Sequence, residues 1–377
     1  MGELKTQPGR SLEQLWARWK FKAKSGLYPF EHAAYQDIEQ AFEKLESYDR
    51  DTWAETFSAV AIKYQEQAHH AEAEGQLQQA LRNYMLAYGH YRVARFPTSN
   101  SAGKWRAYDG SRQMFLAASR FFSHDFQRVK IPMVTDEGTS LIIPGYLCLA
   151  DQSISSGLVI HWGGIDSFKE ERYGHVNVPA FLDQGLSMLL IDMPGTGEAP
   201  VNGSGETHSM FTAVIDWASH DQRTHLLPVC LYGGSFGGYW SAMLAHIFVD
   251  RVACVVSHGG CVHHAFQKEW IDKAQEGEYP FEYSETHAHA FGLSTAADWE
   301  AHAPSLSLLD RGILEQPCAP LLLVDGIHDS VFPIEDTYLL LQHGDPKAVR
   351  LYLRGHMGMT VDTIPQIIRW IATTLSQ

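Results

Sequence analysis

The stretch of sequence that decides the fold is LYGGSFGG, residues 231–238. An apolar run with helical character, residues 239–246, follows it. The pattern G-x-S-x-G, here Gly233, Ser235 and Gly237, is typical of a sharp turn that joins a strand to a helix. Glycine is needed there because the turn is too tight for side chains, and it holds the serine in a strained, exposed position. The alternative is a glycine-rich turn with an incidental serine.

A serine hydroxyl is a weak nucleophile, so a histidine must take its proton and a carboxylate must orient that histidine. In this class of turn the partners follow in the order Ser, Asp, His. Asp329 lies just after a predicted strand at residues 320–325, and His356 lies just after the next one, at 349–354. We therefore predict that Ser235 is a catalytic nucleophile, Asp329 the orienting acid and His356 the base.

Rival residues are present for two of these three roles. Asp325 is a second candidate acid, although it belongs to the end of the predicted strand. His328 and His343 are rival bases, but neither follows a last strand. These alternatives stay open at the level of sequence.

Negative charge that develops on a substrate oxygen during acyl transfer needs two preorganised N–H donors. One donor is expected from Phe236, the residue after the nucleophile. The other is expected from the loop after the third strand, where residues 161–166 read HWGGID and resemble an H-G-G type of oxyanion loop. Gly164 or Ile165 would donate it. The alternative for two adjacent glycines at this position is a plain turn.

The pattern of the whole chain supports an α/β architecture with an added helical domain. Residues 11 to about 122 carry apolar and aromatic residues at helical spacing, and β-rich runs begin near residue 129. We predict an α/β-hydrolase fold with an eight-stranded, mostly parallel sheet (catalytic domain, 126–377) and an N-terminal helical cap domain (1–125). An insertion at about 260–312 is expected to contribute to the lid. The eight predicted strands cover residues 129–134, 141–149, 158–162, 188–192, 229–232, 252–257, 320–325 and 349–354.

Composition narrows the range of partners. The 377 residues include 29 Lys and Arg against 44 Asp and Glu, for a net charge of −15, and 45% of the residues are apolar. That balance suits a globular chain and disfavours a nucleic-acid partner, since acidic surfaces repel phosphates. No apolar run approaches the roughly 18 residues that span a bilayer, and no signal peptide is expected. Five scattered cysteines indicate buried thiols in a reducing cytoplasm.

The chain contains twenty histidines, and histidine is a common metal ligand. However, no H-E-x-x-H motif or Cys/His ligand spacing accompanies them, so we predict no metal site. The histidine pairs that raise the question are His69-His70, His263-His264 and His287/His289.

Scattered sequence blocks point to a particular family. These blocks are residues 19–22, 26–30, 94–97, 278–281, 331–336 and 356–358. Through them the chain resembles the fungal yellowish-green polyketide-shortening hydrolases over nearly its whole length. The oxyanion segment, residues 163–171, is more similar to the bacterial 2,6-dihydroxypseudooxynicotine hydrolase and fermentation-respiration switch branches.

This resemblance implies a retro-Claisen hydrolase that needs no cofactor and cleaves a carbon–carbon bond next to a ketone. The same three residues carry over as nucleophile, acid and base. The pseudooxynicotine branch also implies a glutamate after the sixth strand. No residue of this sequence is identified as its equivalent, and His258, His263, His264 and Glu269 occupy that region. Our candidate substrate-binding residues are His258, His263 and Glu269, with a purely structural role for His258 held equally open. The expected partner is a small aromatic or polyketide-like substrate, and a homodimer is left open.

Two other functions fit the same residues. A carboxylesterase or lactonase needs the same triad and no extra acid. A catalytically silent hydrolase-fold protein that binds a ligand or partner would belong to another class, and failure of a fluorophosphonate probe to label the chain would favour it.

Overall fold

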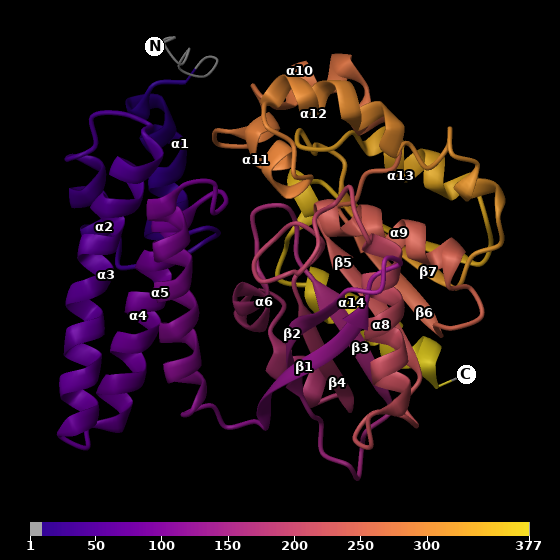
Figure 1. Ribbon diagram of the computed structural model, residues 1–377, viewed down its shortest axis with the longest axis horizontal. Helices are drawn as coiled ribbons and strands as arrows, with labels where there is room; N and C mark the ends of the chain where they lie inside the picture. Colours follow the sequence, from indigo (N-terminus) through magenta and orange to yellow (C-terminus); the bar gives the residue numbers. More distant parts are fainter. Residues whose placement is uncertain (1–9, 377) are drawn as a thin grey trace. The chain divides into compact units, whose positions relative to one another are not determined.

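Eight strands form one mixed sheet in the computed structural model, which describes residues 10–376 (Figure 1). Their order across the sheet is β1-β2-β4-β3-β5-β6-β7-β8. β1 pairs antiparallel with β2 and β2 with β4, whereas all other neighbouring strands are parallel. The predicted α/β-hydrolase fold is therefore confirmed. The strands are β1 Phe126–Val134, β2 Ser140–Cys148, β3 Gly157–Trp162, β4 Leu186–Ile191, β5 Val229–Gly234, β6 Cys254–His258, β7 Leu321–Gly326 and β8 Lys347–Tyr352.

Burial follows the position of each strand in the sheet. Every residue of the inner strands β3, β4, β5, β6 and β7 is buried, as expected when helices cover both faces of a parallel sheet. The edge strand β8 has no fully buried residue. The register pairs Gly234 of β5 with His258 of β6, and Gly326 of β7 with Tyr352 of β8. The loops after these four strands therefore leave the sheet at one edge.

Helices and short turns connect the strands of this part of the chain. Met210, Phe211 and Val214 of α8 recur at helical spacing and join one apolar core with sheet residues such as Ile131 and Ile160. The α-helices are α6 Lys169–His175, α7 Val178–Leu182, α8 Thr207–His220, α9 Phe236–Ile247, α10 Lys268–Ala274, α11 Tyr283–Ala290, α12 Ala296–His302, α13 Ile334–Leu341 and α14 Thr363–Leu375. The short 3₁₀ turns are η1 His264–Phe266, η2 Ala303–Leu306, η3 Ile313–Glu315 and η4 His356–Gly358. The five cysteines are free and buried.

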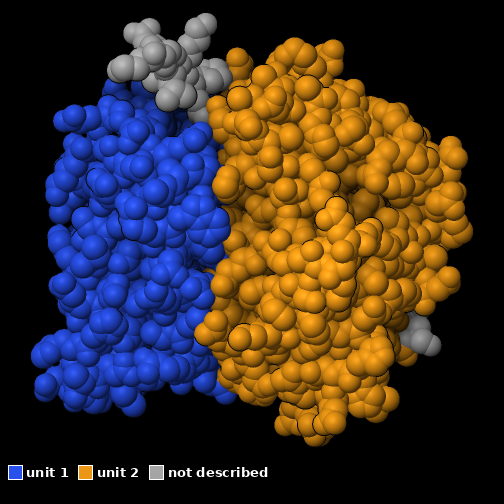
Figure 2. Space-filling model, viewed as in Figure 1, with its two compact units in different colours: residues 1–123, 280–282 blue, residues 124–279, 283–377 orange. Residues whose placement is uncertain are grey.

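The chain divides into two compact units (Figure 2). Unit 1 comprises residues 1–123 together with 280–282, and unit 2 comprises residues 124–279 and 283–377. The helices of unit 1 are α1 Leu12–Lys24, α2 Tyr35–Phe42, α3 Arg50–Ala73, α4 Leu77–Arg95 and α5 Ala102–Ser119, which confirms the predicted helical N-terminal region. None of the described helices is long and apolar enough to cross a membrane.

Side chains from the distant segment 280–282 complete the core of unit 1. The Phe281 ring lies 5.0 Å from the Trp53 ring and 5.7 Å from the Phe96 ring, measured between centroids. The next side chain, Glu282, forms an ion pair with Lys104, with 3.1 Å between Oε2 and Nζ. The helical unit is thus not built from N-terminal residues alone, a feature that its periodicity could not reveal.

The Glu282 ion pair is expected to stabilise unit 1 strongly. Burial raises the pKa of Glu282, but the charges of Lys104 and Arg50 outweigh it and hold that pKa below its ordinary value. Because Lys104 is only 1% exposed, Glu282→Gln should leave a buried charge without a carboxylate and lower the free energy of unfolding by about 3–5 kcal/mol. Chemical denaturation measures this change. The matched control is the double variant Glu282→Leu with Lys104→Met, which should recover most of the loss. A loss below about 1 kcal/mol in the single variant would contradict the prediction.

Candidate active site

The turn between β5 and α9 holds Ser235 in a strained backbone conformation. Its φ is 55° and its ψ is −129°, and its N–H donates to the His258 carbonyl at 2.7 Å. A Cβ on Gly233 would lie 2.0 Å from the carbonyl oxygen of Gly237, and a Cβ on Gly237 would lie 2.2 Å from that of Gly163. Backbone segments therefore approach each other too closely for side chains. The local sequence requires glycine on both sides of the serine, and the strain of about 1–3 kcal/mol is held by the surrounding structure.

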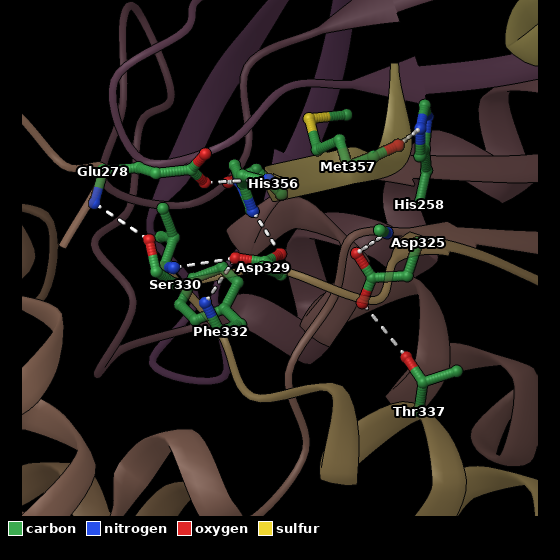
Figure 3. A network of polar contacts seen from close by, with 12 residues as sticks. His258, Glu278, Asp325, Asp329, Ser330, Phe332, Thr337, His356 and Met357 are labelled. Carbon is green, nitrogen blue, oxygen red and sulfur yellow. Dashed lines mark hydrogen bonds and ion pairs between the residues drawn. The ribbon is translucent and has the colours of Figure 1, made fainter. Parts of the chain in front are cut away.

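Three side chains from three different loops form a connected row, of which Figure 3 shows His356 and Asp329. Ser235 Oγ lies 2.8 Å from His356 Nε2, and His356 Nδ1 lies 2.6 Å from Asp329 Oδ2. The other oxygen of Asp329 accepts the N–H groups of Val331 at 2.7 Å and Phe332 at 3.0 Å, which fixes the plane of the carboxylate. The structure thus brings together the three side chains that the sequence predicted as nucleophile, base and acid, at distances that allow proton transfer.

The rival residues make other contacts. Asp325 accepts the Gly326 N–H at 2.7 Å and the Thr337 hydroxyl at 3.1 Å (Figure 3). Burial and the neighbouring charge of Asp329 raise the pKa of Asp325 well above its usual value. Within residues 10–376, Asp325 makes no hydrogen bond to His356, and neither His328 nor His343 bonds Ser235.

The charge state of His356 is set by the carboxylates around it. Burial lowers the pKa of His356, but the charge and hydrogen bond of Asp329, with smaller contributions from Asp325 and Glu278, raise it to about 9. The imidazole is therefore protonated in the resting protein at neutral pH. A reaction that begins with His356 as base must accelerate as the pH rises toward 9, since only the neutral ring can accept the serine proton.

The loop between β3 and α6 lies directly against Ser235. A Cβ on Gly164 would lie 2.7 Å from Ser235 Cβ and 2.9 Å from its Oγ, so only a glycine allows this approach. Within residues 10–376, the backbone N–H groups of Gly164, Ile165 and Phe236 donate no hydrogen bond. Two free donors from this loop and one at the start of α9 are thus available to an oxygen bound at Ser235, and the choice between Gly164 and Ile165 stays open.

Buried charges, which sequence reasoning missed, support this loop. Lys169 Nζ lies 2.8 Å from Asp192 and 2.7 Å from Glu198, and its backbone N–H donates to Asp192 at 2.7 Å. Burial lowers the pKa of Lys169, but the surrounding carboxylates outweigh it and raise that pKa well above its usual value. Arg172 donates to Ser167 Oγ within the loop at 2.5 Å. The available signal was the charged run KEER at 169–172, directly after an apolar strand and turn.

His258, one of the predicted substrate-binding residues, has both ring nitrogens in use. Nδ1 lies 2.9 Å from the Tyr232 hydroxyl, and Nε2 lies 2.7 Å from the carbonyl oxygen of Met357 (Figure 3). Burial lowers the pKa of His258 to about 3, so the ring is neutral, with Nε2–H as donor and Nδ1 as acceptor. These contacts favour the structural role that the sequence left open, because no ring nitrogen is free for a substrate oxygen.

The other two predicted substrate-binding residues lie in the segment between β6 and β7. His263 Nδ1 lies 2.7 Å from Ser307 Oγ, and Glu269 is exposed in the first turn of α10. Neither side chain is hydrogen-bonded to Ser235 or His356 within residues 10–376. Their assignment to substrate stays a prediction. A glutamate that does contact His356 comes from the same segment, Glu278, which sequence reasoning did not single out as a site residue.

No metal-binding cluster occurs in the described part of the chain: no three His, Cys, Asp or Glu side chains lie where they could share an ion. His287 of α11 instead packs within the protein. His287 Nδ1 lies 2.8 Å from the Tyr283 carbonyl, and its ring stacks on that of Trp299.

Sequence comparison finds similarity to known hydrolases. The chain is 25% identical over 192 residues to an esterase FrsA of Yersinia enterocolitica, which covers 48% of this chain and 44% of the relative. It is 27% identical over 220 residues to the hydrolase phmG of Phaeosphaeria nodorum, covering 52% and 49%. The chain thus spans about half the length of the curated relatives that it matches.

The similarity in fold to one solved structure covers almost the whole of both chains. The 2,6-dihydroxy-pseudo-oxynicotine hydrolase superposes with a TM-score of 0.74 at 20% identity, covering 96% of this chain and 95% of that one. The family model described as esterase FrsA-like matches residues 33–375, which include both the helical unit and the sheet. The chain belongs to the esterase FrsA-like family of α/β-hydrolases.

Proposed function

We propose that the protein hydrolyses a carbon–carbon bond next to a ketone, in an aromatic or polyketide-like substrate, through Ser235, His356 and Asp329. The observation that carries this proposal is the row of two short contacts, Ser235 to His356 and His356 to Asp329, beside free backbone N–H donors. The family consists of hydrolases. The resemblance to polyketide-shortening enzymes is the reason for proposing a carbon–carbon bond as the bond that is cleaved. As part of this proposal, the helical domain acts as a cap.

The first half of the reaction makes an acyl-enzyme. Ser235 Oγ attacks the ketone carbon while His356 Nε2 takes the hydroxyl proton, and the carbonyl oxygen gains a negative charge beside the N–H groups of Phe236 and Gly164 or Ile165. Collapse of this intermediate breaks the carbon–carbon bond, and the electron pair leaves with the substrate carbon. That carbanion must be delocalised into a ring or a second carbonyl, and His356 Nε2–H protonates it.

Water completes the cycle. His356 takes a proton from water, the resulting hydroxide attacks the acyl carbon, and the acid leaves as the proton returns to Ser235 Oγ. The net change is that one water molecule adds across the broken bond, with hydrogen on one fragment and a carboxyl group on the other. No oxidant, metal or cofactor enters this balance.

The electrostatics of His356 favour a leaving group that needs a proton. The pKa of His356 is lowered by burial but raised to about 9 overall by Asp329 and the further carboxylates, which stabilises the imidazolium that forms in the first step. A delocalised carbanion is a poor leaving group that benefits from protonation as it departs, and an imidazolium that keeps its proton until that step can supply it. An alkoxide from an ester is a better leaving group and depends less on such a donor.

Ester or lactone hydrolysis is the second candidate function, because the description of the family names an esterase. Under our proposal, an aryl β-diketone should have a kcat/KM at least about tenfold above that of a short p-nitrophenyl ester, because remote binding energy orients the conjugated part of the substrate. The assay must also follow release of the short acid from the diketone. A better ester substrate, with no cleavage product across a panel of aryl ketones, would replace carbon–carbon hydrolysis with the esterase function.

A further inference from the structure

A second carboxylate reaches the base from a segment far away in the sequence. Glu278 precedes α11, and its Oε2 accepts the backbone N–H of His356 at 2.8 Å (Figure 3). The N–H of Glu278 donates to the hydroxyl of Ser330 at 3.0 Å, and Ser330 directly follows Asp329. Glu278 therefore joins the loop that carries the acid to the loop that carries the base.

Glycines in two segments allow Glu278 to approach these loops closely. A Cβ on Gly355 would lie 2.0 Å from Glu278 Oε1, and a Cβ on Gly277 would lie 2.6 Å from the carbonyl oxygen of Ser330. A side chain at residue 355 would displace the Glu278 carboxylate, and one at residue 277 would push the Glu278 segment away from the backbone of Ser330. One glycine thus admits the carboxylate and the other admits the close approach of its segment, which indicates a built feature of the site.

The backbone that Glu278 holds is strained. Met357, the residue after His356, has a φ of 63°, in the left-handed region that non-glycine residues rarely adopt. Its carbonyl accepts a hydrogen bond from His258 at 2.7 Å, while Glu278 accepts the N–H of His356 on the preceding side. One hydrogen bond at the His356 N–H and one at the Met357 carbonyl therefore hold this strained stretch of backbone, and the backbone sets where the imidazole ring lies.

The charge of Glu278 acts on the ring as well as on the backbone. Burial lowers the pKa of His356, the charge and hydrogen bond of Asp329 raise it most, and Asp325 and Glu278 add to that increase. Glu278 is exposed, so solvent and salt screen its contribution more than that of the enclosed Asp329.

We propose that Glu278 is a positioning residue for the reaction: it fixes the His356 backbone and, through its negative charge, favours the imidazolium that forms when Ser235 loses its proton. The inference rests on the proposed function only in that His356 acts as the base for Ser235, and it holds for ester and carbon–carbon substrates alike. Neither the family comparison nor the sequence pattern assigns this role.

The test measures the rate at which a fluorophosphonate probe labels Ser235 across a pH range, since labelling needs the neutral base and no natural substrate. In the wild-type chain the rate should rise with pH, with a midpoint near the His356 pKa of about 9. Glu278→Gln keeps an oxygen acceptor but removes the charge, so its midpoint should fall by about 0.2–0.7 pH unit. The direction follows because a histidine that loses a neighbouring anion releases its proton at lower pH.

Glu278→Ala separates the backbone contact from the charge. It should show the same fall in midpoint and, in addition, a plateau rate at high pH about tenfold below that of wild type, because the His356 N–H loses its acceptor. The shift of the Gln variant should shrink in high salt, as expected for an exposed charge. Glu276→Gln, which removes an exposed charge two residues away, is the matched control and should leave the midpoint unchanged. Thermal unfolding of each variant establishes that the labelled protein is folded at the assay temperature.

The outcomes distinguish this proposal from the function on which it rests. A folded Glu278→Gln variant whose midpoint equals that of wild type would overturn the electrostatic role. A folded Glu278→Ala variant with an unchanged plateau would overturn the role in positioning. Absence of labelling in the wild-type chain would instead overturn the proposed serine mechanism itself, and the role of Glu278 with it.

Discussion

Replacing Ser235 with alanine is expected to lower kcat by about 10⁴- to 10⁶-fold, because nucleophile and base act as one unit. The variant should fold normally: alanine has the same Cβ as serine, so the strained backbone at φ 55° and its hydrogen bond to the His258 carbonyl are unchanged. KM for a substrate should change little, since the oxyanion donors and the rest of the site remain.

Turnover and fluorophosphonate labelling together check this expectation. Both should be lost in Ser235→Ala, while Ser219→Ala, an exposed serine on α8, should behave as wild type. Retention of wild-type turnover by Ser235→Ala would remove this residue from the mechanism. Labelling that persists in the alanine variant would point to a different nucleophile.

The second large effect is expected at Asp329. Asp329→Asn should lower kcat by about 10⁴-fold, because an amide in place of the carboxylate no longer selects the His356 tautomer that presents a free Nε2 to Ser235. The loss of this anion should also lower the pKa of His356, since Asp329 is the main group that raises it against the effect of burial. The remaining activity should therefore reach its half-maximum at a lower pH than in wild type.

Asp325→Asn provides the matched comparison, four residues away and also buried. Burial and the charge of Asp329 raise the pKa of Asp325 well above its usual value, so the ionised form of Asp325 is disfavoured relative to an ordinary carboxylate. An amide of the same shape is then a near replacement, and the rate should fall by less than about tenfold. The test measures kcat/KM for Asp329→Asn and Asp325→Asn. A larger loss of kcat/KM in Asp325→Asn than in Asp329→Asn would assign the role of acid to Asp325.

Much of the sheet could be predicted because buried parallel strands are marked by apolar runs between turn residues. The predicted third strand, residues 158–162, differs from β3 by one residue at its start. The last strand was less accurate, with 349–354 predicted and Lys347–Tyr352 observed. As an edge strand, β8 is only partly buried, so its ends are set by pairing with β7, from Leu321 opposite Lys347 to Gly326 opposite Tyr352. The hydropathy of the sequence does not show which residues of β8 pair with β7.

The grouping into units was also decided by contacts that the sequence does not display. Periodicity indicates where helices form in residues 11–122, and the observed helices α1 to α5 agree with it. It cannot indicate that Phe281 and Glu282, more than 150 residues later, pack with Trp53 and pair with Lys104. A short segment with one aromatic and one acid has no distinctive pattern of its own.

The sequence by itself determined the elbow at Ser235, the order of its partners and the glycines around it. These features depend on local backbone geometry, and local geometry restricts which residues can occupy each position. Only the tertiary structure decided that Asp329 and not Asp325 contacts His356, that both ring nitrogens of His258 are hydrogen-bonded within the protein, and that Glu278 accepts the His356 N–H. The physical reason is that hydrogen bonds act over about 3 Å, so the partner of a side chain is set by how distant loops pack, which no local pattern encodes.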